Sequence, residues 1–176
     1  MHRDPVIVAM NMSQISVLIL MGSDSDAPVM QGAVDVLREF EISCEMTVAS
    51  AHRSPERVMR LVADAPSRGV RLFIVGAGAA AHLGGVVAAH TTLPVIGVPI
   101  DSSALKGMDA LLSTVQMPPG VPVATVSIGK PGATNAGVLA AQILAVGDPA
   151  LAARLVGYKK TLAEKVEQAA AKVHQG

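Results

Sequence analysis

Apolar runs alternate with helical patterns along most of the chain. Five short, aliphatic-rich runs predict strands over residues 15–20, 42–49, 71–75, 95–100 and 121–128. The first run is apolar on both faces, which is typical of a strand that is covered on both sides. The pattern therefore predicts a buried sheet whose strands are separated by other elements.

Each predicted strand is followed by residues with the three-to-four spacing or the composition of a helix. The first two helices are expected to begin at Asp26 and Ser54, each as an N-cap residue with a proline in the first turn. Others are expected around residues 86–88, entered through residues 82–85, and over residues 103–113 and 133–146. This alternation predicts an α/β fold of three layers, a flavodoxin-like doubly wound parallel sheet with strand order 2-1-3-4-5.

An additional C-terminal helix is predicted from Asp148 to about Val173. Apolar side chains recur along it at spacings of three and four, at Leu151, Leu155, Tyr158, Leu162, Val166, Ala169 and Val173. Docking on its own domain and packing against another subunit both explain this stripe. The predicted organisation is a tail (residues 1–13), a flavodoxin-like domain (14–147) and a C-terminal helix (148–176).

Composition excludes several classes of partner. Lysine plus arginine equals aspartate plus glutamate at 14 each, and aromatic residues make up 2% of the chain, which argues against nucleic acid. No apolar stretch approaches the roughly 18 residues of a membrane span, and residues 1–13 lack a signal-peptide pattern. Cys44 is the single cysteine, which fits a reducing compartment, so we expect a cytoplasmic protein.

The turn at residues 50–55, with the sequence SAHRSP, carries the strongest candidate chemistry. Arg53 lies next to a predicted helix N-terminus, and both favour an anion such as phosphate or carboxylate. His52 beside it can take and give a proton near neutrality. The turn therefore indicates a catalytic site for a phosphorylated small molecule, although a solvated loop would show the same residues.

Two other turns follow predicted strands and are expected to meet the first in one crevice. Residues 22–26 (GSDSD) offer hydroxyls for a phosphate and carboxylates for sugar hydroxyls, and helix capping is the alternative explanation. Residues 76–81 (GAGAAA) allow a ligand to approach the backbone, or a helix to pack closely. His82 is either a ligand contact or a structural residue. No cluster has metal-ligand spacing, so no metal is expected.

Several of these motifs, taken together, resemble the N5-carboxyaminoimidazole ribonucleotide mutase family of purine biosynthesis. The matching segments are MGSDSD at 21–26, SAHRSP at 50–55, GAG at 76–78 with HL at 82–83, LKGMD at 105–109, QMP at 116–118 and residues 135–145. They occur in the family's order and span roughly residues 15–158. The family moves a carboxylate from an exocyclic nitrogen to ring carbon 4 without metal, ATP or biotin.

The resemblance implies a role for each matched residue. His52 would be the general acid and base. The phosphate and nearby groups would be held by Ser23, Ser25, Ser50 and Arg53, and the ribose hydroxyls by Asp26. The wall around the base and carboxylate would consist of Ala77, Gly78, His82 and Leu83. The family implies no cofactor and a homo-oligomer, which we expect to be an octamer.

Ala79 and Gly84 depart from the family pattern, which has glycine and proline at these positions. We expect these departures to affect the reaction rate and the rigidity of the loop rather than the type of reaction. Two alternatives stay open. A related carboxylase uses CO2 and aminoimidazole ribonucleotide directly, but such enzymes tend to carry lysine where this chain has Arg53. A non-catalytic nucleotide- or flavin-binding module is the other, and the scarcity of aromatic residues argues against flavin.

Overall fold

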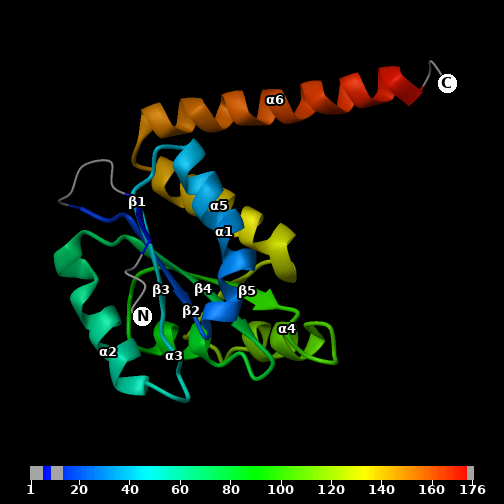
Figure 1. The fold of residues 1–176 in the computed structure, drawn as a ribbon. Helices are drawn as coiled ribbons and strands as arrows, with labels where there is room; N and C mark the ends of the chain where they lie inside the picture. The colour runs from blue at the N-terminus through cyan, green and yellow to red at the C-terminus, as the bar shows by residue number, and fades with distance from the viewer. Residues whose placement is uncertain (1–5, 9–13, 174–176) are drawn as a thin grey trace. The chain divides into compact units, whose positions relative to one another are not determined.

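The computed structural model describes residues 6–8 and 14–173 (Figure 1). The chain divides into two compact units, residues 1–140 and 141–176. A sheet forms the centre of the first unit, and the described strands follow the order β1-β3-β2-β4-β5-β6. Its parallel strands are β2 (Val17–Met21), β3 (Cys44–Val48), β4 (Leu72–Gly78), β5 (Val95–Ile100) and β6 (Ala124–Thr125). Their order confirms the predicted 2-1-3-4-5 topology.

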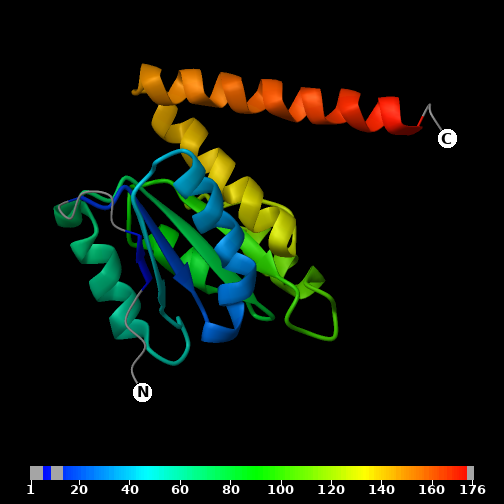
Figure 2. The ribbon, with the colours of Figure 1, turned by 45° about the horizontal axis from the view of Figure 1, so that its top comes forward.

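Helices cover both faces of this sheet (Figures 1 and 2). On one face, α1 (Ala27–Glu39) packs against the early turns of α5 (Gly129–Ala145). The two helices approach so closely that a Cβ on Gly137 would lie 2.8 Å from Cβ of Val36. The other face is covered by α2 (Pro55–Asp64), α3 (Leu83–Ala89) and α4 (Met108–Val115). The three-layer prediction is therefore confirmed.

The core on the second face explains why the strands are apolar. One cluster contains Leu18 and Leu20 of β2, Phe73 of β4, Val58 of α2 and Val87 of α3. All five residues are fully buried. The intervening strand residues Val17, Ile19 and Ile74 point to the opposite face and are equally buried. A strand between two helical layers must be apolar at every position, because neither face contacts water.

Three elements differ from the sequence-based expectation. The predicted strand 121–128 contracts to Ala124–Thr125 at the sheet edge, where Pro122 lacks the N–H that pairing needs. The helix predicted over 103–113 begins only at Met108, because Lys106 and Gly107 adopt left-handed φ values of 51° and 84°. Within the expected tail, β1 (Val6–Val8) forms an antiparallel strand against β3.

The second unit contains the predicted C-terminal helix, α6 (Pro149–Val173). Asp148 caps it as expected, since its Oδ1 accepts hydrogen bonds of 3.0 Å from the N–H groups of Ala150 and Leu151. Leu151 is buried, whereas Leu162 and Val166 are 38% and 66% exposed. The later part of the apolar stripe is therefore accessible on the single chain.

Candidate active site

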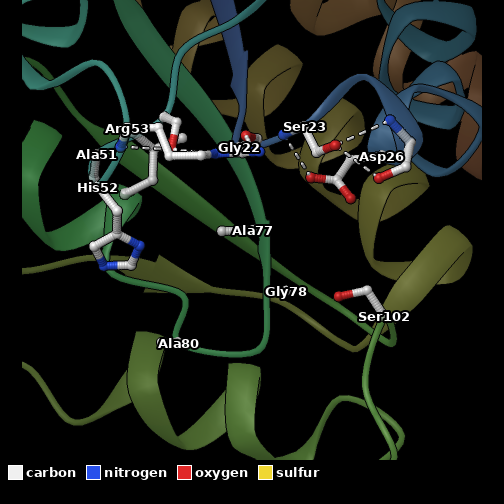
Figure 3. A pocket seen from close by; sticks show the side chains of 13 residues that line it. Gly22, Ser23, Asp26, Ala51, His52, Arg53, Ala77, Gly78, Ala80 and Ser102 are labelled. Carbon is white, nitrogen blue, oxygen red and sulfur yellow. Dashed lines mark hydrogen bonds between the residues drawn. The ribbon is translucent and has the colours of Figure 1, made fainter.

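A pocket lies at the carboxyl end of the parallel sheet (Figure 3). Its walls come from the turns after β2, β3 and β4, as the sequence predicted, and from the segment after β5. The lining residues are Gly22, Ser23, Ser25, Asp26, Ser50, Ala51, His52, Arg53, Ala77, Gly78, Ala80, Leu83 and Ser102. The cavity volume is about 190 Å³. This is below the ~300–1,000 Å³ of pockets that enclose a ligand, so one chain would enclose a ligand of ordinary size only in part.

The turn after β2 is held rigid by its own polar groups. Ser23 caps a short 3-10 helix (Asp24–Asp26), because its Oγ accepts from the N–H of Ser25 at 3.3 Å. The N–H of Ser23 donates to Oδ2 of Asp26 at 3.1 Å, and Oγ of Ser25 donates to Oγ of Ser23 at 2.9 Å. Asp26 was expected to cap α1 with its side chain. Its side chain instead accepts from the N–H of Ser23 and completes a capping box with that residue. The box fixes both serine hydroxyls at the pocket.

The turn after β3 positions Arg53 against the first turn. Nη2 of Arg53 donates to the carbonyl oxygen of Gly22 at 3.0 Å, and its backbone N–H donates to Oγ of Ser50 at 3.2 Å. Ser54 precedes α2 as predicted but does not cap it. Its hydroxyl accepts from the N–H of Ser50 at 3.2 Å and donates to the Ser50 carbonyl at 3.3 Å, which stabilises the turn.

The two candidate histidines form a pair across different turns. Nε2 of His52 lies 2.8 Å from Nδ1 of His82, and the rings meet edge to face with centroids 4.9 Å apart. At this distance one nitrogen must donate a hydrogen and the other must accept it. His82 is outside the pocket lining and contacts His52, which lines it. A tight turn places it there, with the N–H of His82 donating to the Ala80 carbonyl at 2.8 Å.

Small apolar residues form the wall between these polar groups. Ala77 and Gly78 end β4, and Figure 3 shows both between the His52 side of the pocket and the Ser23 side. Leu83, which is 2% exposed, begins α3 beside them. The arrangement combines a hydroxyl and guanidinium cluster, a proton-carrying pair and an apolar wall. It can bind an anion and transfer a proton in the same crevice.

All but one of the predicted site residues line the pocket, and His82 contacts one that does. The sequence-based reasoning missed Gly22, Ala51, Ala80 and Ser102. The first three lie within or next to the motifs that were identified. Ser102 follows the carboxyl end of β5, so the rule that ligands bind at the carboxyl ends of parallel strands could have found it.

Asp26 is the titratable group of the pocket with the clearest electrostatic perturbation. Asp26 is 5% exposed. Burial raises the pKa of its carboxyl above the ordinary value of 3.8, and the hydrogen bonds from Ser23 and Ser25 oppose that effect. Among the residues that the structure describes, no group of three histidine, cysteine or acidic side chains could hold a metal ion. None of the described helices is long and apolar enough to cross a membrane.

Comparison with known proteins identifies the family. The family model described as AIR carboxylase matches residues 16–165. The chain belongs to this family. Three curated relatives carry the name N5-carboxyaminoimidazole ribonucleotide mutase. The Thermotoga maritima protein is 50% identical over 89% of this chain and 91% of its own. The Mycobacterium tuberculosis protein is 55% identical over 84% of each, and the Bacillus subtilis protein 54% over 85% and 95%.

Solved structures support the same assignment to the AIR carboxylase family. The crystal structure of Treponema denticola PurE superposes with a TM-score of 0.80 at 30% sequence identity. The superposition covers 90% of this chain and 98% of that one. The resemblance that the motifs indicated is thus confirmed over nearly the whole chain.

The buried carboxyl of Asp26 predicts a pH-dependent stability difference. Its pKa is higher in the folded than in the unfolded state, so ionisation weakens the fold. The wild type should be most stable relative to Asp26→Asn below about pH 4, and should lose that advantage as the pH rises through the folded-state pKa. Urea unfolding between about pH 3 and pH 7 measures the difference.

The exposed carboxylate of Asp35 on α1 supplies the matched control, because Asp35→Asn removes a charge that solvent already screens. If the wild type instead gained stability over Asp26→Asn with rising pH, the carboxyl would be stabilised as an anion, and the electrostatic account of this turn would be wrong.

Proposed function

We propose that the protein is an N5-carboxyaminoimidazole ribonucleotide mutase of purine biosynthesis. It is then an isomerase that moves the carboxylate of its substrate from the exocyclic nitrogen to ring carbon 4, and the product is 4-carboxy-5-aminoimidazole ribonucleotide. The names of the relatives support this assignment. The observation that carries it is the position of His52, which lies beside Arg53 and against an apolar wall in one pocket.

In this proposal His52 transfers one proton in each of two steps. As the bond between the exocyclic nitrogen and the carboxylate carbon breaks, His52 donates a proton to the nitrogen and CO2 is released. Carbon 4 then attacks CO2, and His52 recovers a proton from that carbon. The atoms and the proton balance, so the reaction needs no co-reactant. The contact with His82 holds the His52 ring in place between the two steps.

The wall residues keep CO2 in the pocket. Ala77 and Leu83 are 8% and 2% exposed and present no charge. Released CO2 is apolar and reactive, so a dry wall slows both its escape and its hydration. Gly78 continues this wall and lets the ligand approach the backbone.

The polar side of the pocket binds the ribonucleotide. The phosphate is held by the guanidinium of Arg53 and the hydroxyls of Ser23, Ser25 and Ser50, and the ribose hydroxyls by Asp26. The rigid turns described above support this proposal, because donors that are already positioned lose little entropy on binding.

Direct carboxylation of aminoimidazole ribonucleotide is the second candidate, since the family model is described as AIR carboxylase. One assay separates the two activities. Without ATP or metal, a mutase converts N5-carboxyaminoimidazole ribonucleotide, whereas a carboxylase consumes aminoimidazole ribonucleotide and CO2. A colourless protein that binds the nucleotide without converting it would be a non-catalytic module.

Three finer properties complete the proposal: the enzyme uses no cofactor, acts in the cytoplasm and assembles as a homo-octamer. The proton cycle of His52 supports the first. The single, buried Cys44 is compatible with a reducing compartment. The small cavity and the exposed part of the α6 stripe support a partner subunit.

The role of His52 predicts that His52→Asn abolishes turnover but retains ligand binding. A general acid and base contributes about 10²–10⁴-fold in rate. The measurements are the mutase assay and isothermal titration with the product. His90→Asn is the matched control, because His90 caps the end of α3 outside the pocket. More than about a tenth of wild-type activity in His52→Asn would contradict this role.

The role of Arg53 predicts that Arg53→Ala weakens binding of the ribonucleotide far more than binding of the dephosphorylated nucleoside. Charge-assisted hydrogen bonds to a phosphate contribute about 1.5–3 kcal/mol. Arg57→Ala is the control, since Arg57 bonds to the carbonyl of Val48 and the hydroxyl of Thr47. An equal loss for both ligands would place the phosphate elsewhere.

The proposed subunit contact predicts that Leu162→Glu with Val166→Glu lowers the molar mass measured by light scattering. These side chains are 38% and 66% exposed on the single chain, and a charge there would be buried in an interface on α6. Gln168→Glu adds one charge at another exposed position of the same helix. A wild-type monomer would refute the contact, and so would an assembly that the double variant leaves intact.

A further inference from the structure

Ser102 lines the pocket but belongs to none of the three motif-bearing turns. It lies two residues beyond β5, whose last residue Ile100 pairs with Gly78 at the end of β4. The register of the two strands therefore brings Ser102 to the apolar wall of the pocket. In Figure 3, its hydroxyl oxygen points from the β5 side toward Gly78.

The absence of a side chain at Gly78 makes room for this hydroxyl. A Cβ built on Gly78 would lie 1.8 Å from Oγ of Ser102 and 2.9 Å from its Cβ. It would also lie 3.2 Å from the carbonyl oxygen of Ile100, which limits how the two strands could move apart. The serine thus occupies the volume of the missing side chain and puts a polar group on an otherwise apolar wall.

The hydroxyl of Ser102 is available to a ligand. Ser102 is exposed, and within residues 6–8 and 14–173 it makes no hydrogen bond to another protein group. The pocket hydroxyls of Ser23, Ser25 and Ser50 differ, because each already bonds within its own turn. A hydroxyl that is held beside a wall without a protein partner can donate its hydrogen to a bound acceptor.

We propose that Ser102 donates a hydrogen bond to the carboxylate on the imidazole ring, and so distinguishes carboxylated from uncarboxylated nucleotide. The inference rests on the proposed function. With the phosphate at Arg53 and the reacting carbon within reach of His52, the base lies along Ala77 and Gly78. A carboxylate there has several lone pairs to satisfy, and the side chains of this wall offer no donor besides Ser102.

The test compares two ligands that differ by the carboxylate alone: 4-carboxy-5-aminoimidazole ribonucleotide and 5-aminoimidazole ribonucleotide. Isothermal titration measures both affinities for the full-length wild type and for Ser102→Ala. A lost hydrogen bond to a charged group corresponds to about a tenfold or greater weakening. We expect that loss for the carboxylated nucleotide and less than about a threefold change for the other.

Ser103→Ala is the matched control. Ser103 is the next residue, and its hydroxyl accepts from the N–H of Leu105 at 3.2 Å, within the loop rather than in the pocket. If Ser102→Ala acted by loosening this loop, Ser103→Ala would weaken both ligands at least as much. Thermal unfolding confirms that each variant is folded before the affinities are compared.

The outcomes separate this inference from the proposed function. An equal loss for both nucleotides in Ser102→Ala would place the hydroxyl on the ribose or phosphate and overturn the inference, as would no loss. After either of these two results, conversion of the substrate by the wild type would still support the mutase assignment. A wild type that binds neither nucleotide would overturn both.

Discussion

The parallel register of the four central strands is the constraint on which the site depends. Met21 of β2 pairs with Val48 of β3 and with Gly76 of β4, and Gly78 of β4 pairs with Ile100 of β5. The carboxyl ends of the strands therefore lie level with one another. The turns that follow these strands are up to 80 residues apart in sequence, yet they lie at the same edge of the sheet. The hydrogen bonds between the strands fix the strand ends, and so fix where the turns begin. The bond from Arg53 to the Gly22 carbonyl joins two of these turns directly.

Most of the fold could be predicted because the strands are buried on both faces. Val95–Ile100 was predicted with its observed bounds, since all six residues are buried and proline and polar residues flank the run. The edges of the sheet were less predictable. Edge strands have fewer partners and tolerate proline, so β6 is shorter than its apolar run, and β1 lies in a segment that resembles a tail.

The candidate site could be located from sequence, but its internal contacts could not. Motif residues after three strands identified the crevice. The pairing of His52 with His82 depends on the conformation of a turn, and the role of Ser54 depends on whether its hydroxyl bonds to Ser50 or caps α2. Neither choice has a sequence period or spacing. Ser102 carries no motif of its own, and its place after the carboxyl end of β5 is the one sequence signal that points to the pocket.

Ala79 shows how a departure from the family pattern affects the site through the backbone. It replaces the family's glycine, yet Ala79 is not among the residues that line the pocket. It adopts a left-handed φ of 50°, where a side chain costs roughly 1–2 kcal/mol relative to the right-handed region. The carbonyl of this residue accepts from the N–H of Ala81, within the same turn that aims His82 at His52. The fold therefore maintains a strained residue in the turn that brings His82 to His52, and buried residues, Ala77 and Ala81, anchor the chain before and after it.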